Sequence, residues 1–163
     1  MPADFDPARL LAHLVEHELR FIVVGGVAAI LHGSPLMTED LDVVYSTQPE
    51  NLERLSHALS ELKAIYRDPA GRRIQPDLDR LVSIKTHLLK TEFGSLDLLK
   101  TIGPDLGYHE LLEKSSPVEV EGVQVHVVDL EQLIEAKELA GRPKDRIGVL
   151  YLRELLDRRS GQS

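Results

Sequence analysis

The stretch from Val23 to Val44, VVGGVAAILHGSPLMTEDLDVV, decides how this chain is organised. It begins inside an apolar run, Phe21 to Val24, whose β-branched residues are typical of a strand buried on both faces. Gly25 and Gly26 interrupt the run, and Val27 to His32 is predicted to form a short helix. From Asp40 to Tyr45 the alternation of residue types predicts a second strand. We therefore expect a strand–helix–strand unit.

Two aspartates of the second strand, Asp40 and Asp42, are predicted to point to the same face, because strand side chains alternate. Their carboxylates would lie within reach of one hard divalent cation such as Mg²⁺. The alternative is a strand with one solvated face. The glycine pair also has two readings. It either lets a phosphate approach the backbone at a helix N-terminus or only shapes the turn. Gly26 lies 14 positions before Asp40, so both features belong to one unit.

The composition indicates one acidic domain. The chain has 163 residues, of which 42% are hydrophobic and 28% charged, and no cysteine, which excludes disulfides and thiolate metal sites. A net charge of -8 argues against a broad basic surface for nucleic acid. No apolar run is long enough to span a membrane, and the first residues lack the order of a secretory signal. We expect a cytoplasmic protein that does not contact a membrane.

The remaining segments predict an α+β fold. It comprises a small mixed or antiparallel sheet flanked by helices, with a C-terminal helical pair. Helices are expected from Pro7 to Glu18, Pro49 to Leu62, Tyr108 to Lys114, Leu130 to Ala140 and Lys144 to Arg158. Strands are expected at Leu81 to Thr91, Ser95 to Lys100, Val118 to Val120 and Val123 to Val128. We expect residues 1–128 to form the core and residues 129–163 to form helices packed on it, as one domain overall.

Gly25-Gly26, thirteen further residues and then Asp40-Leu41-Asp42 resemble the signature of the DNA polymerase beta-like nucleotidyltransferase superfamily. His32-Gly33 and Thr38 extend the likeness to small bacterial members related to abortive-infection, type IV toxin–antitoxin proteins. The similarity is concentrated in residues 21–45, with a second patch in residues 130–155. It implies a minimal nucleotidyltransferase fold in which the glycine pair cradles the phosphates of a nucleotide. It also implies that the two aspartates and a third carboxylate on a later strand form a two-metal site for Mg²⁺, with Mn²⁺ as an alternative.

Asp97 is the candidate for the third carboxylate. It lies within the apolar run SLDLL, where an unpaired buried charge is costly and a bound cation would relieve that cost. Otherwise Asp97 faces solvent on an edge strand or pairs with a lysine such as Lys85. Asp79 and Asp105 are weaker rivals, because both lie in turn-like sequence.

The second patch adds cationic candidates. Lys137 shares the apolar stripe of its helix, so it either snorkels to solvent or serves a site. The resemblance implies that Lys137 meets the triphosphate, with Lys144 or Arg142 as a helper. Either helper could instead pair with Asp145 to fix the turn between the last two helices.

Three features near the motif are less specific. Ser34 is a candidate phosphate donor or a turn residue, and His32 is expected to be structural. The other histidines show no ligand spacing that we recognise. Many relatives carry an arginine where this chain has Leu36-Met37. If that arginine contacts the nucleotide or the acceptor in the relatives, this chain binds them differently or is less active.

These observations predict a metal-dependent transfer of a nucleoside monophosphate from an NTP to a hydroxyl group. Asp97, by analogy nearest the acceptor, would help to deprotonate that hydroxyl. The toxin relatives imply an RNA acceptor, particularly tRNA 3′ ends, whereas other relatives modify proteins or small molecules such as aminoglycosides. A toxin role would require an antitoxin protein as partner. The alternatives are a module of the same fold that binds a nucleotide or a partner without catalysis, and an interaction protein whose acids are only solvated.

Overall fold

The computed structural model describes residues 4–161, which form one seven-stranded sheet with helices around it. The strands are β1 (Phe21–Val24), β2 (Asp40–Tyr45), β3 (Ile65–Tyr66), β4 (Thr86–Thr91), β5 (Gly94–Leu99), β6 (Ser115–Val120) and β7 (Val123–Val128). The helices are α1 (Pro7–Glu16), α2 (Gly25–Leu31), α3 (Pro49–Glu61), α4 (Leu78–Ser83), α5 (Tyr108–Leu112), α6 (Leu130–Ala140) and α7 (Pro143–Ser160).

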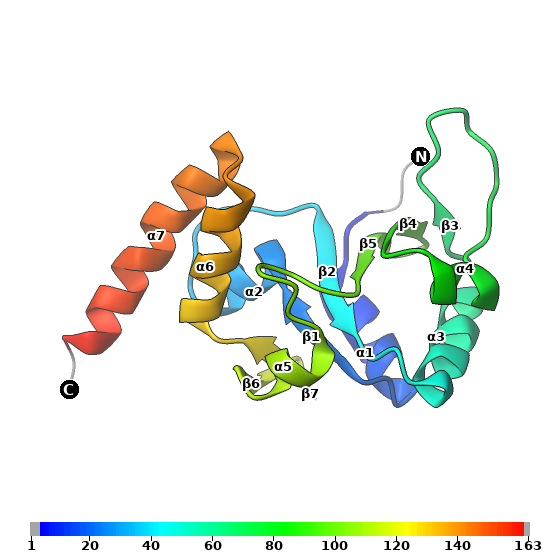
Figure 1. Cartoon of the computed structure of the whole chain (residues 1–163), viewed down its shortest axis with the longest axis horizontal. Coiled ribbons are helices and arrows are strands. Elements are labelled where there is room, and N and C mark those ends of the chain that lie inside the picture. The colour runs from blue at the N-terminus through cyan, green and yellow to red at the C-terminus, as the bar shows by residue number, and fades with distance from the viewer. Residues whose placement is uncertain (1–3, 162–163) are drawn as a thin grey trace.

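The sheet is mixed, and the strands pair in the order β3-β4-β5-β2-β1-β7-β6. The interior strand β1 runs antiparallel to the central strand β2 and parallel to β7, and β2 runs parallel to β5. The hairpins β4–β5 and β6–β7 extend the sheet on its two sides. Figure 1 shows α6 and α7 side by side at one end of the molecule and α3 with α4 near β3 at the other end. The predicted α+β class with a C-terminal helical pair is confirmed.

The predicted strand–helix–strand unit is present as β1, α2 and β2. All four residues of β1 are buried, as expected for a strand in the middle of a sheet. In β2 the apolar residues Leu41 and Val43 are buried, whereas Asp40 and Asp42 are only partly buried. The alternation therefore separates an apolar face from a face that carries both carboxylates.

One predicted strand was too long. The sequence predicts a strand from Leu81 to Thr91, but β4 begins only at Thr86. Residues 81–83 belong instead to helix α4. The Asp77 carboxylate accepts a hydrogen bond from the backbone N–H of Arg80, which is an N-cap that the sequence reading overlooked. The two-residue strand β3 was not predicted either.

The C-terminal helices follow directly after the last strand. Gly141 ends α6 in the left-handed conformation, and α7 begins two residues later. The division between residues 128 and 129 stays a prediction, and its outer limits, residues 1 and 163, lie outside the described residues. Within residues 4–161, no helix combines the length and the apolarity needed to span a membrane.

Candidate active site

Three aspartates meet where β2 and β5 lie side by side. The register of this parallel pair places Asp42 opposite Asp97, and Asp40 opposite Ser95. One carboxylate oxygen from each of Asp40, Asp42 and Asp97 lies within 4.8 Å of the others. Asp97 is on an interior strand, not an edge, because β4 flanks β5 on its other side. The rivals Asp79 and Asp105 are exposed elsewhere and do not belong to this cluster.

Asp42 is the member of this aspartate triad with a buried, unpaired oxygen. Its Oδ1 is buried and has no hydrogen-bond partner among the described residues. Burial, together with the neighbouring charges of Asp97 and Asp40, raises the pKa of Asp42 to about 7. A buried, partnerless carboxylate oxygen next to two further carboxylates has the donor chemistry of a site for a hard divalent cation.

The two glycines are required by close packing against this site. Gly25 has a φ of +66°, and a Cβ atom there would lie 2.1 Å from Oδ2 of Asp42. A Cβ atom on Gly26 would lie 2.6 Å from Oγ1 of Thr38. That hydroxyl in turn donates to the carbonyl oxygen of Asp40 at 3.3 Å. Missing side chains at the start of α2 therefore allow the backbone to approach the carboxylates closely.

Arg67 is a site residue that the sequence analysis missed. Its Nη1 donates to Oδ1 of Asp97 and to the carbonyl oxygen of Leu89, both at 2.8 Å. Arg67 follows β3, and its backbone N–H donates to the carbonyl oxygen of Leu88 on β4. Asp97 thus has a cationic partner, but the partner is an arginine and not the lysine that the sequence suggested. The signal was present only as a basic residue at the start of a long loop.

Lys137 reaches the same site from α6. A pocket of about 200 Å³ is lined by Asp42, Gly25 and Lys137, together with residues of the α6–α7 turn. Burial lowers the pKa of Lys137, and the carboxylate of Asp145, whose Oδ1 lies 3.9 Å from Nζ, opposes that effect. Lys137 therefore lines the same pocket as Gly25 and Asp42, and its contact with a triphosphate stays a prediction.

Asp145 holds the turn between α6 and α7. Its side chain is 3% exposed and receives Nε and Nη2 of Arg142 at 2.6 and 3.2 Å. Burial would raise the pKa of Asp145, but the hydrogen bond and charge of Arg142 outweigh burial, and the net shift is downward. Of the two alternatives for Arg142, the structural pairing with Asp145 is the one observed.

Three other sequence candidates lie apart from the triad. Lys144 is exposed in the first turn of α7 and does not line the pocket that Lys137 lines. Ser34 follows the C-terminal end of α2, whereas the glycine pair begins that helix, and its Oγ accepts from the backbone N–H of Leu36 at 3.3 Å. His32 is structural: its Nδ1 accepts from Arg159, and its Nε2 donates to the carbonyl oxygen of Val128 at 2.7 Å.

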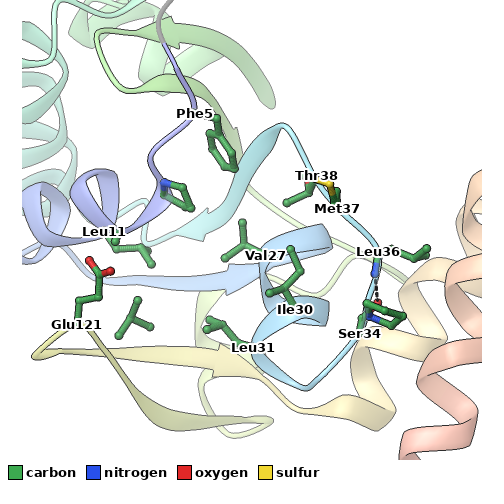
Figure 2. A pocket seen from close by; sticks show the side chains of 14 residues that line it. Phe5, Leu11, Val27, Ile30, Leu31, Ser34, Leu36, Met37, Thr38 and Glu121 are labelled. Carbon is green, nitrogen blue, oxygen red and sulfur yellow. Dashed lines mark hydrogen bonds between the residues drawn. The ribbon is translucent and has the colours of Figure 1, made fainter.

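Ser34 lines a different, largely apolar pocket of about 420 Å³. Figure 2 shows Ile30, Leu31 and Val27 of α2 on one side of it and the loop that carries Leu36 and Met37 on the other. Met37 is 95% exposed. The position is thus open to solvent and contributes no charge to the triad.

Comparison with known proteins agrees with this geometry. A family model described as "Nucleotidyl transferase AbiEii toxin, Type IV TA system" matches residues 9–146. A search of curated proteins gave no match.

Solved structures with the same fold are similar over nearly the whole chain. The lincomycin-bound lincosamide antibiotic adenylyltransferase LnuA has a TM-score of 0.63 and 12% identity, over 94% of this chain and 99% of the other. An antigenic nucleotidyltransferase-like protein from Paracoccidioides brasiliensis has a TM-score of 0.58 and 16% identity, over 91% and 73%. ANT(2'')-Ia in complex with adenylyl-2''-tobramycin has a TM-score of 0.56 and 16% identity, over 90% and 85%.

Proposed function

Because the chain belongs to the AbiEii family of nucleotidyl transferase toxins, we propose that it transfers a nucleoside monophosphate from an NTP to a hydroxyl group of an acceptor. The observation that carries the proposal is the convergence of Asp40, Asp42 and Asp97 beside the glycine turn. In the ion-free protein this arrangement is unfavourable, since three carboxylates repel one another and one buried oxygen lacks a partner. A binding function accounts for such a cluster better than a structural one.

The three aspartates would hold one or two divalent cations, Mg²⁺ or Mn²⁺. Such cations, when bound, neutralise charge on the attacking and leaving oxygens of a phosphoryl substitution. The backbone at Gly25 and Gly26 would contact the triphosphate in the pocket beside Asp42. Lys137, which lines that pocket from α6, would offset the negative charge of the phosphates. Asp97 would accept the proton of the attacking hydroxyl while Arg67 holds its carboxylate in place. Asp145 and Arg142 keep the lysine-bearing helix against the site.

The proposed nucleotide-binding set is therefore Gly25, Gly26 and Lys137. Lys144 and Ser34, the two other candidates, lie where the structure gives them no contact with the pocket around Asp42. We expect substitutions at these two positions to change NTP affinity little.

Binding is the first test. Isothermal titration of the wild type with each of the four NTPs, with and without Mg²⁺, should give metal-dependent heat. Asp42→Asn keeps the size of the side chain and removes the charge, so it should abolish that heat while the protein stays folded. Asp79→Asn, at an exposed carboxylate on α4, is the matched control and should bind like the wild type. Equal binding by Asp42→Asn and the wild type would refute the assignment.

Transfer is the second test, and it also identifies the acceptor. The protein is incubated with each α-³²P-labelled NTP and with total RNA, purified tRNA, a cell protein fraction or hydroxyl-bearing antibiotics. Label that becomes bound to one acceptor class, and does not with Asp42→Asn, supports the proposal. NTP binding without label transfer to any class would support the alternative, a nucleotide-binding module without catalysis. Because the family consists of toxins of toxin–antitoxin systems, an antitoxin partner is also tested. The protein is co-expressed with the product of the neighbouring gene.

A further inference from the structure

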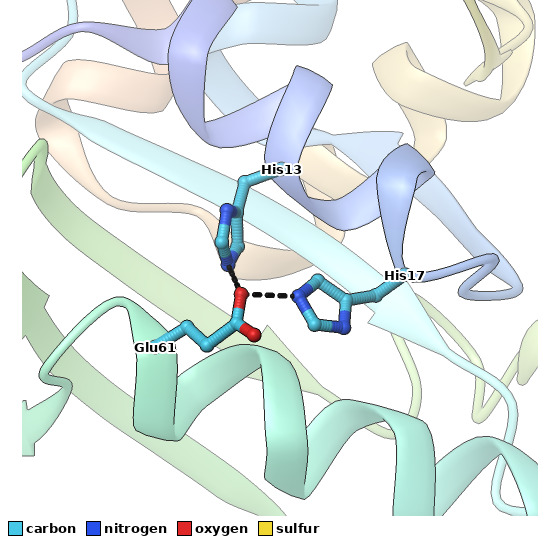
Figure 3. Close-up of side chains that lie close together, drawn as sticks. All are labelled: His13, His17 and Glu61. Atoms are coloured by element: carbon cyan, nitrogen blue, oxygen red, sulfur yellow. Dashed lines mark hydrogen bonds and ion pairs between the residues drawn. The ribbon is translucent and has the colours of Figure 1, made fainter.

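A second cluster of potential metal ligands lies on the helical side of the molecule, between α1 and α3. His13 lies in the last turn of α1, His17 is the C-cap residue four positions later, and Glu61 is the last residue of α3. Figure 3 shows both imidazole rings directed toward the same carboxylate. None of the three residues lines the pocket around the aspartate triad. The expectation that the remaining histidines lack ligand spacing was therefore wrong for this pair.

The donor atoms already stand close to metal-binding distances. Oε2 of Glu61 lies 2.8 Å from Nε2 of His17 and 3.5 Å from Nε2 of His13. Ligand atoms around a tetrahedral Zn²⁺, each about 2.0–2.1 Å from the ion, are about 3.3 Å apart. The observed separations bracket that value, so an ion could enter with small side-chain adjustments.

The surroundings favour a site that is partly formed and open on one side. The side chains of His13 and His17 are 17% and 18% exposed, so packing already restricts their rotamers. Glu61 is 61% exposed, which leaves room for water as a fourth ligand. Nε2 of His13 also lies 3.3 Å from the carbonyl oxygen of Ala58, a weak hydrogen bond that coordination would replace.

The chemistry of the donors selects the class of ion. Glu61 offers a carboxylate oxygen that lies 2.8 Å from Nε2 of His17. Two imidazoles and one carboxylate form a donor set that suits Zn²⁺ and similar transition-metal ions, whereas Mg²⁺ prefers the all-oxygen triad. The two clusters should therefore discriminate between ions.

We propose that His13, His17 and Glu61 bind a zinc-class divalent cation that links α1 to α3. The ion would join residues 44 to 48 positions apart in the chain and would fix the N-terminal helix to the helix that leads into β3. The competing interpretation is that the trio is only a hydrogen-bonded contact between two helices. The two interpretations differ in whether a metal ion stabilises the protein.

The test uses untagged, EDTA-treated protein in the presence of excess Mg²⁺, added so that the carboxylate triad does not compete for Zn²⁺. Zn²⁺ at about 100-fold above its dissociation constant should raise the Tm of the wild type by about 5–10 °C. Co²⁺ in place of Zn²⁺ should give the visible d–d bands of a low-coordinate ion with nitrogen ligands.

Two variants locate the ion, and one serves as control. His17→Ala and Glu61→Gln should each weaken Zn²⁺ binding by more than ~10-fold and remove the Co²⁺ bands. His126→Ala, at an exposed histidine on β7, should behave as the wild type. A Zn²⁺-independent Tm in the wild type overturns the proposal, as does a Zn²⁺ effect that both variants retain. Because Glu61→Gln preserves shape, it reports on the ion even if His17→Ala impairs folding.

Discussion

Replacement of Asp42 by asparagine should stabilise the ion-free protein above neutral pH while it destroys metal binding. The pKa of Asp42 is raised from 3.8 to about 7, chiefly by burial. Between these two values the folded state binds a proton that the unfolded state has released. Stability therefore falls as the pH rises from about 4 to 7 and stays low above that range. Asparagine has no such titration, so Asp42→Asn escapes the loss.

The size of the effect follows from the two pKa values. A change of one pH unit in pKa corresponds to about 1.36 kcal/mol, so the raised pKa of Asp42 represents about 4 kcal/mol at pH 8. The amide of asparagine would itself be buried without partners at a cost of about 1–3 kcal/mol, which does not change with pH. The pH-independent cost of the amide cancels if two differences are compared. The first is the free energy of unfolding of the variant minus that of the wild type at pH 8, and the second is the same difference at pH 5. We expect the first difference to exceed the second by about 3 kcal/mol, in favour of the variant.

The measurement is urea unfolding of both proteins at the two pH values with EDTA present. The titration of all groups distant from the triad occurs in both proteins and cancels in the comparison. Saturating Mg²⁺ at pH 8 should then remove the advantage of the variant, because the ion stabilises only the wild type. A difference between the two proteins that does not change from pH 5 to pH 8, or that changes in the opposite direction, would refute the reasoning.

Three further predictions concern groups around Asp42. The Gly25→Ala variant should lose Mg²⁺-dependent NTP binding and at least about 1–2 kcal/mol of stability. The cause is that Gly25 adopts a left-handed conformation and that an added Cβ would clash with the Asp42 carboxylate. Titration calorimetry measures the binding, and urea unfolding measures the stability. Lys137→Met should raise the KM for the NTP by about 10–100-fold, whereas Lys144→Met should change it by less than about threefold, in a steady-state assay with the acceptor. The Arg67→Leu variant should reduce kcat far more than NTP affinity, because Asp97 would lose the guanidinium that holds its carboxylate in place. An equal loss of kcat and NTP affinity would contradict the positioning role of Arg67.

Much of the fold was predictable because the central unit has strong local signals. A β-branched run, a glycine pair and an alternating acidic strand define β1, α2 and β2, and each appears within one or two residues of its expected bounds. The miss at residues 78–83 has a local cause as well. Leu81 and Val82 suit a strand, but the cap from Asp77 starts a helix before them.

The site was less predictable, because it depends on register and on contacts distant in sequence. Asp97 was a candidate from its apolar context, but only the pairing of β2 with β5 shows that it lies beside Asp42. Arg67 reaches Asp97 across β4, and no spacing in the chain indicates that contact. His13 and His17 did have a visible i, i+4 spacing, but Glu61 comes from another helix. Local patterns identify the chemical groups, and the tertiary fold selects their partners.

The distribution of positive charge explains why the triad still needs an ion. Three cationic side chains lie near it, and none is committed to Asp42: Arg142 lines the pocket but is paired with Asp145. Arg67 is bound to Asp97 at 2.8 Å, and Lys137 has Asp145 as its nearest carboxylate, at 3.9 Å. Oδ1 of Asp42 therefore remains without a partner at the centre of the cluster. A further protein cation beside Oδ1 of Asp42 would satisfy the oxygen and stabilise the fold, but it would also fill the place where we propose that a divalent ion and a phosphate bind. The instability expected of the ion-free protein above pH 7 is thus the direct consequence of keeping that place open.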